Sequence, residues 1–318
     1  MTELDSRPRA GLLAPHGSGV LSIPHPVPAV TCAVVVTYNP DRELGERISN
    51  VIGQFPRVFV VDNASATPVQ SMLRSIASDP KVKLVLNPEN RGIAQALNQG
   101  LTHALEEGFS WCVTLDQDTV VFDDMLEVLI SVHSGCGYEK VLVGGNYFNV
   151  SKRRNFIDCK ADEKNYRERK TLITAGMLLP VREAVQMGGF RDDYFIDSVD
   201  HEFCLRARDQ GFKVVISCKP VMSQFIGSKI EAKAWLSRFA SFNHSPARKY
   251  YIARNTIVTA REYCLREPAW AARQGWRLLS DFVSILLFES EKYTKAKSFM
   301  RGILHGIAGK MGQLPGSH

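Results

Sequence analysis

The sequence lacks a long hydrophobic run. Its 318 residues are 45% hydrophobic, yet the longest apolar stretches cover only residues 29–38 and 282–288. Both are shorter than the roughly 18 to 20 residues that cross a bilayer. The first residues include Glu3 and Asp5 and contain no apolar segment typical of a secretory signal. We therefore expect a chain that spans no membrane and works in the cytoplasm.

Closely spaced cysteine pairs are also missing. The seven cysteines are odd in number and scattered, and none forms a C-x-x-C motif. This pattern supports neither a disulfide framework nor a zinc knuckle. We expect the cysteines to be small buried apolar residues.

Several nucleotide-binding signatures are absent. No G-x-G-x-x-G follows the first apolar run, and Gly309-Lys310 lacks the remaining residues of a P-loop, which disfavours a dehydrogenase or a P-loop enzyme. A nucleotidyltransferase would carry a glycine-rich arm with Arg and Lys near its first strand, and residues 34–40 offer none. No nucleic-acid recognition motif is present either, so only net charge would favour a nucleic-acid partner.

Basic residues are concentrated at one end of the chain. Residues 229–318 contain 15 Lys and Arg against 6 Asp and Glu, whereas residues 1–228 contain 24 against 27. A basic module of this kind indicates an anionic partner, either phosphate-bearing lipid or nucleic acid.

The apolar pattern predicts an α/β fold. Residues 1–30 contain five prolines and are expected to form a flexible leader. After them, short β-branched runs alternate with helical segments, which is typical of a parallel sheet flanked by helices. The predicted strands cover residues 32–37, 58–61, 82–86, 111–115, 141–143, 172–179 and 214–216, and the predicted helices cover 44–54, 72–77, 92–107, 124–132 and 202–210. From residue 232 the pattern is helical, which gives an α/β domain at 31–228 and a basic helical extension at 229–318.

Ligands of parallel sheets bind beyond the carboxyl ends of the strands, where this sequence places polar residues. Asp116 and Asp118 follow one strand and could together hold a hard divalent cation, although Asp-x-Asp is also common in surface turns. Asp62 could accept a hydrogen bond from a nucleoside or begin an Asx-turn. Arg91 precedes a helix N-terminus that favours phosphate, but it could equally be a solvated side chain beside a turn glycine.

A second acidic stretch opens the helix predicted at 202–210. Asp197, Asp200 and Glu202 lie among apolar and aromatic residues there. A helix N-terminus keeps carboxylates ionised, and an ionised carboxylate in a partly dry site can act as a general base. Helix capping explains one of these acids but not three.

Five ordered segments resemble the family 2 inverting glycosyltransferases. They are VTYNP at 36–40, VDNAS at 61–65, NRGIAQALNQG at 90–100, LDQDT at 115–119 and FIDSVDHE at 195–202. The LDQD form, the FIDxVDxE form and the segment from His244 to Asn255 are most similar to the bacterial rhamnosyltransferase branch. The resemblance covers about residues 31–310.

The resemblance implies a GT-A fold, a nucleotide-sugar donor such as dTDP-L-rhamnose, Mg²⁺ or Mn²⁺, and a single displacement with inversion. It assigns catalysis to Asp200 as the base, with Glu202 orienting nearby groups. Asp116 and Asp118 would hold the metal, and Asp116 would also contact the donor. The remaining donor-binding residues would be Thr37, Asn39, Asp62, Arg91, Asn98 and Arg254.

One position departs from the family pattern. Many relatives have a metal-ligating His shortly before Ile-Gly, where this chain has Gln224, and an amide is a weaker ligand than an imidazole. Gln224 thus predicts weaker metal binding or a metal-independent site, and one alternative is a paralogue that binds glycan or lipid and has lost catalysis. A second alternative is a family 2 transferase that uses another nucleotide sugar. The acceptor could be a core oligosaccharide, an O-antigen precursor or a rhamnolipid-type lipid.

Two apolar stripes occur in the basic extension. We expect the upstream stripe, from Trp276 to Leu286, to pack on the catalytic domain. The terminal stripe, from Phe299 to Ile307, is flanked by Lys295, Lys297 and Arg301 and is typical of an interfacial helix on anionic lipid. This predicts peripheral attachment to the inner face of the cytoplasmic membrane.

Overall fold

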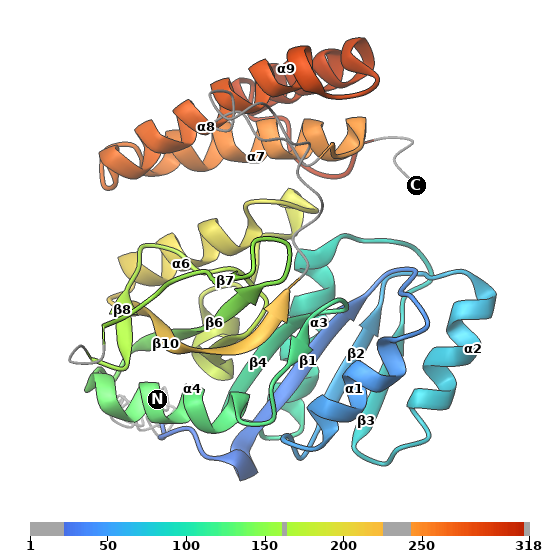
Figure 1. The fold of residues 1–318 in the computed structure, drawn as a ribbon, viewed down its shortest axis with the longest axis vertical. Coiled ribbons are helices and arrows are strands. Elements are labelled where there is room, and N and C mark those ends of the chain that lie inside the picture. Colours follow the sequence, from blue (N-terminus) through green and yellow to red (C-terminus); the bar gives the residue numbers. More distant parts are fainter. Residues whose placement is uncertain (1–21, 161–163, 225–242, 315–318) are drawn as a thin grey trace, which may run out of the picture.

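The computed structural model describes residues 22–160, 164–224 and 243–314. Most of the expected leader, 1–30, lies outside the described residues, and its end forms a short 3₁₀ turn, Pro28–Val30. A mixed sheet with helices on both faces forms the larger part of the molecule, and a layer of three helices lies above its carboxyl edge (Figure 1).

Alternating strands and helices build the first half of the sheet, as the sequence predicts. The runs at residues 31–37, 58–62 and 111–115 are buried in the sheet, the run at residues 82–86 at its edge is only partly buried, and the helices bury apolar residues against the sheet. The elements are β1 (Thr31–Thr37), α1 (Leu44–Ile52), β2 (Val58–Asp62), α2 (Thr67–Ile76), β3 (Val82–Leu86), α3 (Ile93–Glu106), β4 (Trp111–Asp116), β5 (Val120–Val121) and α4 (Met125–Cys136).

The second half contains longer and less regular elements. They are β6 (Val141–Asn149), β7 (Arg154–Asn155), β8 (Tyr166–Glu168), β9 (Met177–Pro180), α5 (Val181–Gln186), a 3₁₀ turn (Asp192–Tyr194), α6 (Val199–Asp209) and β10 (Lys213–Gln224). The strand order is β3-β2-β1-β4-β9-β6-β10-β5. β1 to β4 pair in parallel, whereas β9 pairs antiparallel to both β4 and β6. The α/β class with a mostly parallel sheet is thus confirmed, and β9 is the strand that periodicity alone could not orient.

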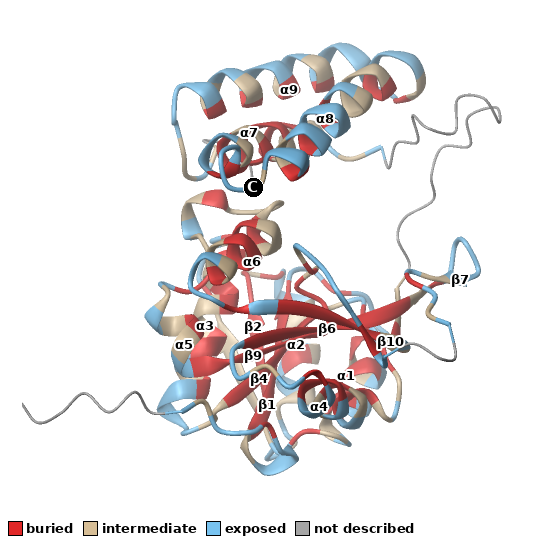
Figure 2. Cartoon of the chain, turned by 90° about the vertical axis from the view of Figure 1, so that its left-hand side faces the viewer, coloured by how far each residue is buried: buried red, intermediate tan, exposed pale blue. Residues whose placement is uncertain are grey.

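Three helices, α7 (Pro246–Tyr263), α8 (Pro268–Phe288) and α9 (Lys292–Ile307), form the layer above the sheet (Figure 2). α7 and α9 pack closely because glycines face the contact: a Cβ at Gly302 would lie 2.3 Å from the carbonyl oxygen of Tyr250. Glu289 lies between two lysines, 2.7 Å from Lys249 and 3.0 Å from Lys295, and all three are buried. This ion-pair cluster ties the α8–α9 connection to α7.

The expectation that no cysteine is paired is wrong. Cys159 and Cys218 form a disulfide across 59 residues. Cys159 follows β7 and Cys218 lies within β10, so their proximity depends on the sheet and leaves no spacing signal in the sequence. Of the five free cysteines, four are buried, as expected for small apolar residues, and Cys264 is exposed.

Within the described residues, no helix is long and apolar enough to cross a membrane.

Candidate active site

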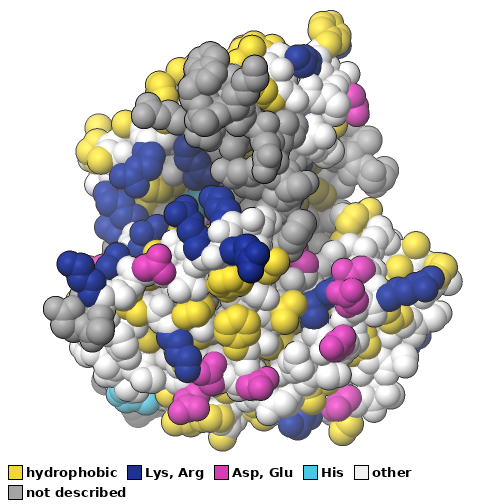
Figure 3. Space-filling model, viewed as in Figure 1, with side chains coloured by type: hydrophobic (Ala, Val, Ile, Leu, Met, Phe, Trp, Pro, Cys, Tyr) yellow, Lys and Arg dark blue, Asp and Glu magenta, His cyan; other side chains and the backbone are white. Residues whose placement is uncertain are grey.

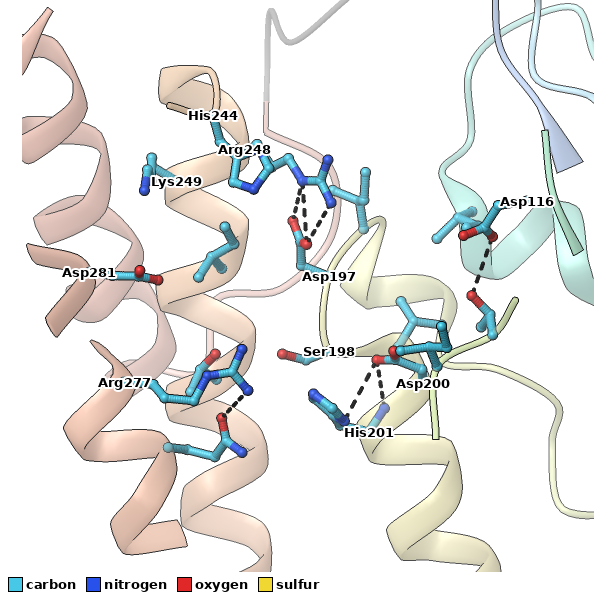
Figure 4. Close-up of a pocket in the computed structure, with 18 of the residues that line it drawn as sticks. Asp116, Asp197, Ser198, Asp200, His201, His244, Arg248, Lys249, Arg277 and Asp281 are labelled. Carbon is cyan, nitrogen blue, oxygen red and sulfur yellow. Dashed lines mark hydrogen bonds and ion pairs between the residues drawn. The ribbon is translucent and has the colours of Figure 1, made fainter. Parts of the chain in front are cut away.

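A cavity of about 590 Å³ lies between the carboxyl edge of the sheet and the layer of three helices. β4 and the turn after it contribute Asp116 and Asp118, and the first turn of α6 contributes Asp200. Arg248 on α7 and Arg277 on α8 face them from the helical layer (Figure 4). The structure therefore brings together the two acidic motifs, which are about 80 residues apart in sequence, and covers them with cationic side chains.

The carboxylates in this cavity perturb one another. Burial, followed by the charges of Asp118 and Asp200, raises the pKa of Asp116 to about 7. Its Oδ1 lies 3.4 Å from the hydroxyl of Thr174. Ionisation of this carboxyl group is costly, and a nearby cation favours its ionised form.

The residues fit a divalent cation only in part. Among the residues that the structure describes, no group of three or more His, Cys, Asp and Glu side chains is arranged to hold a metal. Two carboxylates, Asp116 and Asp118, reach the same cavity, and Gln224 at the end of β10 lines it as well. This set suits a hard cation that takes its other ligands from water and from a substrate diphosphate.

Asp200 presents its carboxylate to the cavity from the first turn of α6. Its Oδ1 accepts a hydrogen bond from the backbone N–H of His201 at 2.7 Å, and the Nδ1 of His201 lies 4.0 Å away. Its bonds leave acceptor capacity free on the side that faces the cavity (Figure 4). A hydroxyl bound there can give up its proton to Asp200.

The loop before α6 has an unusual backbone. Phe195, Asp197 and Ser198 all have positive φ, between 60° and 65°. Such angles are costly for residues other than glycine and persist where surrounding contacts enforce them. Asn255 supplies those contacts, because its amide donates to the carbonyl oxygens of Tyr194, Ile196 and Asp197 at 2.8 to 2.9 Å.

Arg254 is not a donor-binding residue in this structure, contrary to the sequence-based expectation. Its side chain is fully buried and donates to the carbonyl oxygens of Asp193, Tyr194 and Gly312. A guanidinium whose donors are satisfied by carbonyl groups in the interior cannot also bind a phosphate. Arg254 instead fixes the helical layer to the loop that precedes α6.

Arg248, six residues earlier on α7, is the arginine that reaches the cavity. It pairs with Asp197 at 3.2 Å, and its side chain is 44% exposed. The charges of Asp197, Asp116 and Asp118 raise its pKa, although burial opposes them. Arg248 is therefore available to a ligand anion.

Glu202 does not line the cavity. It is buried and accepts two hydrogen bonds from Arg206, at 2.9 and 3.0 Å, one turn along α6. Arg206 also donates to the carbonyl oxygens of Met187 and Gly189. Glu202 therefore anchors α6 and can act on catalysis only by positioning Asp200.

The carboxyl ends of β1 and β2 bring together Thr37, Asn39 and Asp62, as expected. These residues mainly contact one another and Ser65. Thr37 donates to Asp62 at 2.9 Å, Ser65 donates its N–H to Asp62 at 2.8 Å, and both Thr37 and Asp62 are fully buried. The side chains that were expected to contact a nucleoside therefore bond to neighbouring protein groups and are buried. Asp62 begins the turn that was the alternative to nucleoside binding, and Asn39 is exposed beside it.

Asn98 and Arg91 lie outside the cavity lining. The amide of Asn98 bonds Phe190 twice and Asp192 once, all at 2.7 Å, so it anchors α3 to the segment after α5. Arg91 pairs with Glu89 at 3.2 Å on the surface. The N-terminus of α3 is closed by the carbonyl oxygen of Phe195, which accepts from Ile93 at 2.8 Å. Gly92 allows this approach, because a Cβ there would lie 2.4 Å from that oxygen.

Sequence reasoning missed several residues of this cavity. His244, Arg277 and Asp281 line it, and burial lowers the pKa of His244 to about 4 and raises the pKa of Asp281. His201 also lines it, although no motif in the sequence indicates a role for this residue. Charged and apolar residues alternate along α8, and this pattern does not indicate which face of the helix lies toward the sheet.

Comparison with known proteins agrees with this geometry. The model of the family described as "Glycosyl transferase family 2" matches residues 32–191. The chain is similar to "dTDP-rhamnosyl transferase RfbF" of Shigella flexneri, with 29% identity over 248 residues, which cover 72% of this chain and 79% of that protein.

Solved structures share the fold. A mannosyltransferase from Pyrobaculum calidifontis, PcManGT, solved with GDP-Man and Mn²⁺, matches with a TM-score of 0.54 and 16% identity over 88% of each chain. Residues 1–349 of S. aureus TarS match with a TM-score of 0.51 and 13% identity, covering 88% of this chain and 72% of that one. The family expected from the five sequence motifs is confirmed, and so is the expected fold.

Proposed function

Because the chain belongs to glycosyl transferase family 2, we propose that it transfers L-rhamnose from dTDP-L-rhamnose, with inversion, to a hydroxyl group of a bacterial cell-surface glycan or glycolipid. The observation that carries this proposal is the joint presence of Asp116, Asp118 and Asp200 in one cavity. The similarity to a dTDP-rhamnosyl transferase over most of both chains supports the choice of donor. The retained carboxylates disfavour a non-catalytic paralogue.

In the proposed reaction, the acceptor oxygen attacks the anomeric carbon of the donor sugar. The new C–O bond forms as the bond from that carbon to the diphosphate oxygen breaks, and the electron pair leaves with the diphosphate. Asp200 takes the proton of the acceptor hydroxyl, which raises its nucleophilicity as the bond forms. One displacement inverts the anomeric carbon, so no covalent enzyme intermediate is needed.

The other residues of the cavity serve the leaving group and the geometry. Arg248 lies where it can offset negative charge on the departing diphosphate. Asp116 and Asp118, with Gln224 nearby, would hold Mg²⁺ or Mn²⁺, which when bound neutralises diphosphate charge. Asn255 and Arg254 hold the loop before α6, and so fix where Asp200 stands.

The donor assignment is tested by nucleotide release. The wild-type protein is incubated with Mn²⁺ and one nucleotide sugar at a time: dTDP-L-rhamnose, dTDP-glucose, UDP-GlcNAc or GDP-mannose. Without an acceptor, slow hydrolysis of the donor should release the nucleoside diphosphate. The rate of dTDP release from dTDP-L-rhamnose should be at least about tenfold higher than the rate of nucleotide release from each other donor, which corresponds to about 1.4 kcal/mol of discrimination. Faster release from another donor would overturn the rhamnose assignment, and no release from any would favour a non-catalytic binding protein.

We also propose that the helical layer attaches to the inner face of the cytoplasmic membrane. Its outer side exposes large apolar residues on both α8 and α9, and hydrophobic side chains gather along that end of the molecule (Figure 3). These residues are Trp276, Leu279, Leu286, Leu287, Tyr293, Met300, Leu304 and Ile307. Lys292, Lys297 and Arg301 are exposed among them on α9. Apolar and cationic side chains together suit an anionic bilayer surface.

The structure corrects two details of the sequence-based expectation for this surface. Lys295 cannot contact lipid, because it is only 2% exposed and pairs with Glu289. The upstream stripe was expected to pack on the catalytic domain, but Trp276, Leu279 and Leu286 are 63%, 53% and 46% exposed. Phe299, by contrast, is buried between the helices.

Vesicle flotation tests the attachment. The protein should float with phosphatidylglycerol vesicles but not with phosphatidylcholine vesicles, and salt should weaken the binding. Lys297→Gln/Arg301→Gln should reduce the bound fraction several-fold. The control Arg74→Gln/Arg182→Gln, which removes two exposed cations of the α/β domain, should bind normally. Equal binding to both vesicle types, or binding to neither, would contradict electrostatic attachment.

A further inference from the structure

A second cavity, of about 430 Å³, lies next to the active-site cavity. Ile173, His201, Gln274 and Arg277 line both, so the two cavities share a wall and meet at His201. In the close-up, Asp116 lies on one side of Asp200, and His201 and Arg277 lie on the other (Figure 4). The second cavity is therefore reached from Asp200 on the side away from the expected metal-binding residues.

The lining of this second cavity is strongly cationic. Arg169 and Lys170 come from the segment after β8, and Arg273 and Arg277, one helical turn apart on α8, share a face toward them. Basic side chains gather between the sheet and the helical layer on this side of the molecule (Figure 3). Glu168 is the only acidic side chain among the described lining residues, and it accepts a hydrogen bond from Tyr138 at 2.7 Å.

The four cations differ in how they are compensated. Lys170 pairs with Glu267, which also pairs with Arg208, and Arg277 contacts Gln274 at 3.4 Å. Within the described part of the chain, Arg169 and Arg273 have no acidic partner within 4.0 Å. Two uncompensated guanidinium groups facing one cavity favour a ligand with a phosphoryl group, which binds guanidinium through paired hydrogen bonds.

Aromatic side chains accompany the charges. Phe156 is 46% exposed and stacks on Tyr147 with ring centroids 4.8 Å apart, while the guanidinium of Arg169 lies 5.4 Å from the Phe156 ring. Trp270 also lines this cavity, with its ring 6.1 Å from that of His201. A flat apolar face beside fixed polar groups is a common way to bind and orient a small ligand, here a sugar ring.

We propose that the second cavity is the acceptor subsite and that it takes a glycosyl phosphate or diphosphate. This inference rests on the proposed glycosyl transfer. The phosphoryl group lies between Arg169 and Arg273, and the sugar ring extends past Phe156 and His201 so that its hydroxyl reaches Asp200. Arg169 and Arg273 line the second cavity and not the active-site cavity, where the donor diphosphate is expected at Asp116, Asp118 and Arg248. The acceptor therefore carries a negative charge of its own, and the cavity binds its phosphoryl group and its sugar ring with different side chains.

Binding of hexose 1-phosphates tests the subsite directly. Calorimetry is performed without metal on protein saturated with dTDP, using the 1-phosphates of glucose, galactose and mannose and the matching neutral methyl glycosides. At least one hexose phosphate should bind about tenfold or more tightly than its methyl glycoside, and binding should weaken with salt. Equal affinity for the two forms, or no binding of any hexose phosphate, would overturn the proposal.

Variants locate the binding. Arg169→Gln/Arg273→Gln should lower the affinity for the hexose phosphate at least about tenfold, whereas Arg74→Gln/Arg182→Gln should leave it unchanged. Both variants should keep the urea unfolding midpoint of the wild type, which shows that they fold. Unchanged affinity in the first variant would place the phosphate elsewhere, and displacement of the hexose phosphate by phosphatidylglycerol vesicles would assign the cavity to a lipid headgroup and contradict the glycosyl phosphate.

Failure of this proposal differs from failure of the proposed function. A wild-type protein that hydrolyses dTDP-L-rhamnose but binds no hexose phosphate contradicts the subsite alone. A protein that binds hexose phosphate but releases nucleotide from no donor contradicts glycosyl transfer, and with it the role of this cavity as an acceptor site.

Discussion

Replacing Asp116 with Asn should stabilise the metal-free protein at alkaline pH. In the folded protein the pKa of Asp116 is about 7, compared with its usual 3.8, because of burial and the neighbouring Asp118 and Asp200. The folded state therefore binds this proton more tightly than the unfolded state, so stability falls as the pH rises from about 4 to about 7 and then levels off. An amide in place of the carboxylate removes this loss.

The magnitude follows from the difference between the two pKa values. The pKa of Asp116 differs by about three units between the two states, and each unit corresponds to about 1.36 kcal/mol. The substitution can therefore stabilise the protein by at most about 4 kcal/mol above pH 7. Asp116 is partly accessible at the cavity wall, and water that reaches it reduces this value, so we expect a gain of about 2 kcal/mol at pH 8. At pH 5 the wild-type carboxyl is already protonated in the folded state, and the gain should shrink by about 1 kcal/mol or more.

Urea denaturation in EDTA at pH 5 and pH 8 measures this difference. Wild type, Asp116→Asn and the control Asp123→Asn, which alters an exposed acid outside the cavity lining, are compared by their midpoints at constant m. Added Mn²⁺ should stabilise the wild type more than Asp116→Asn, because the variant keeps only one of the two carboxylates, Asp118, that are expected to bind the cation. If the gain is equal at both pH values, or if Asp116→Asn is less stable than wild type at pH 8, the electrostatic reasoning about this cavity is refuted.

Three further substitutions test other residues of the site. Asp118→Ala should weaken donor binding at least about tenfold in the presence of Mn²⁺ but not in EDTA, as measured by calorimetry with dTDP-L-rhamnose, because the diphosphate loses its bridging cation; equal losses in both conditions would contradict a metal role. Gln224→His should tighten Mn²⁺ binding several-fold in a metal titration, since imidazole is the better ligand, and an unchanged titration would place Gln224 outside the metal site. Arg254→Met should lower the free energy of unfolding by about 3 kcal/mol, because the charged hydrogen bonds from the buried guanidinium to the carbonyl oxygens of Asp193, Tyr194 and Gly312 are lost; a variant of normal stability with weakened donor binding would restore Arg254 as a donor ligand.

The sequence predicted the first half of the fold closely, because strand and helix alternate there with clear periodicity. The strand expected at residues 82–86 is β3 without change, and the helix expected at 92–107 is α3, Ile93–Glu106. The acids Asp116, Asp118 and Asp200 were also predictable, since they follow apolar runs or open a helix at the sheet edge. The local sequence pattern is sufficient to predict an element where that element packs against its neighbours along the chain.

The sequence did not predict which polar residues of an element face the cavity. Arg248 and Arg254 lie on the same helix, and only the packing of α7 on the loop before α6 buries one and exposes the other. Lys295 resembles a surface lysine in sequence, but Glu289 comes close to it only after α8 and α9 have packed on α7. Cys159 and Cys218, similarly, meet through β10, so their pairing follows from the sheet and not from their spacing.

Asp200 is proposed as the general base that takes the acceptor proton, and Asp200→Asn removes this function. The amide keeps the shape of the side chain but cannot take the acceptor proton, so transfer from dTDP-L-rhamnose should fall by about 10² to 10⁴. The Kd of the donor, measured on the same preparation with Mn²⁺, should stay within about twofold of wild type. A variant that keeps more than about a tenth of the wild-type transfer rate with unchanged donor affinity would show that another group takes the proton, and would contradict the account.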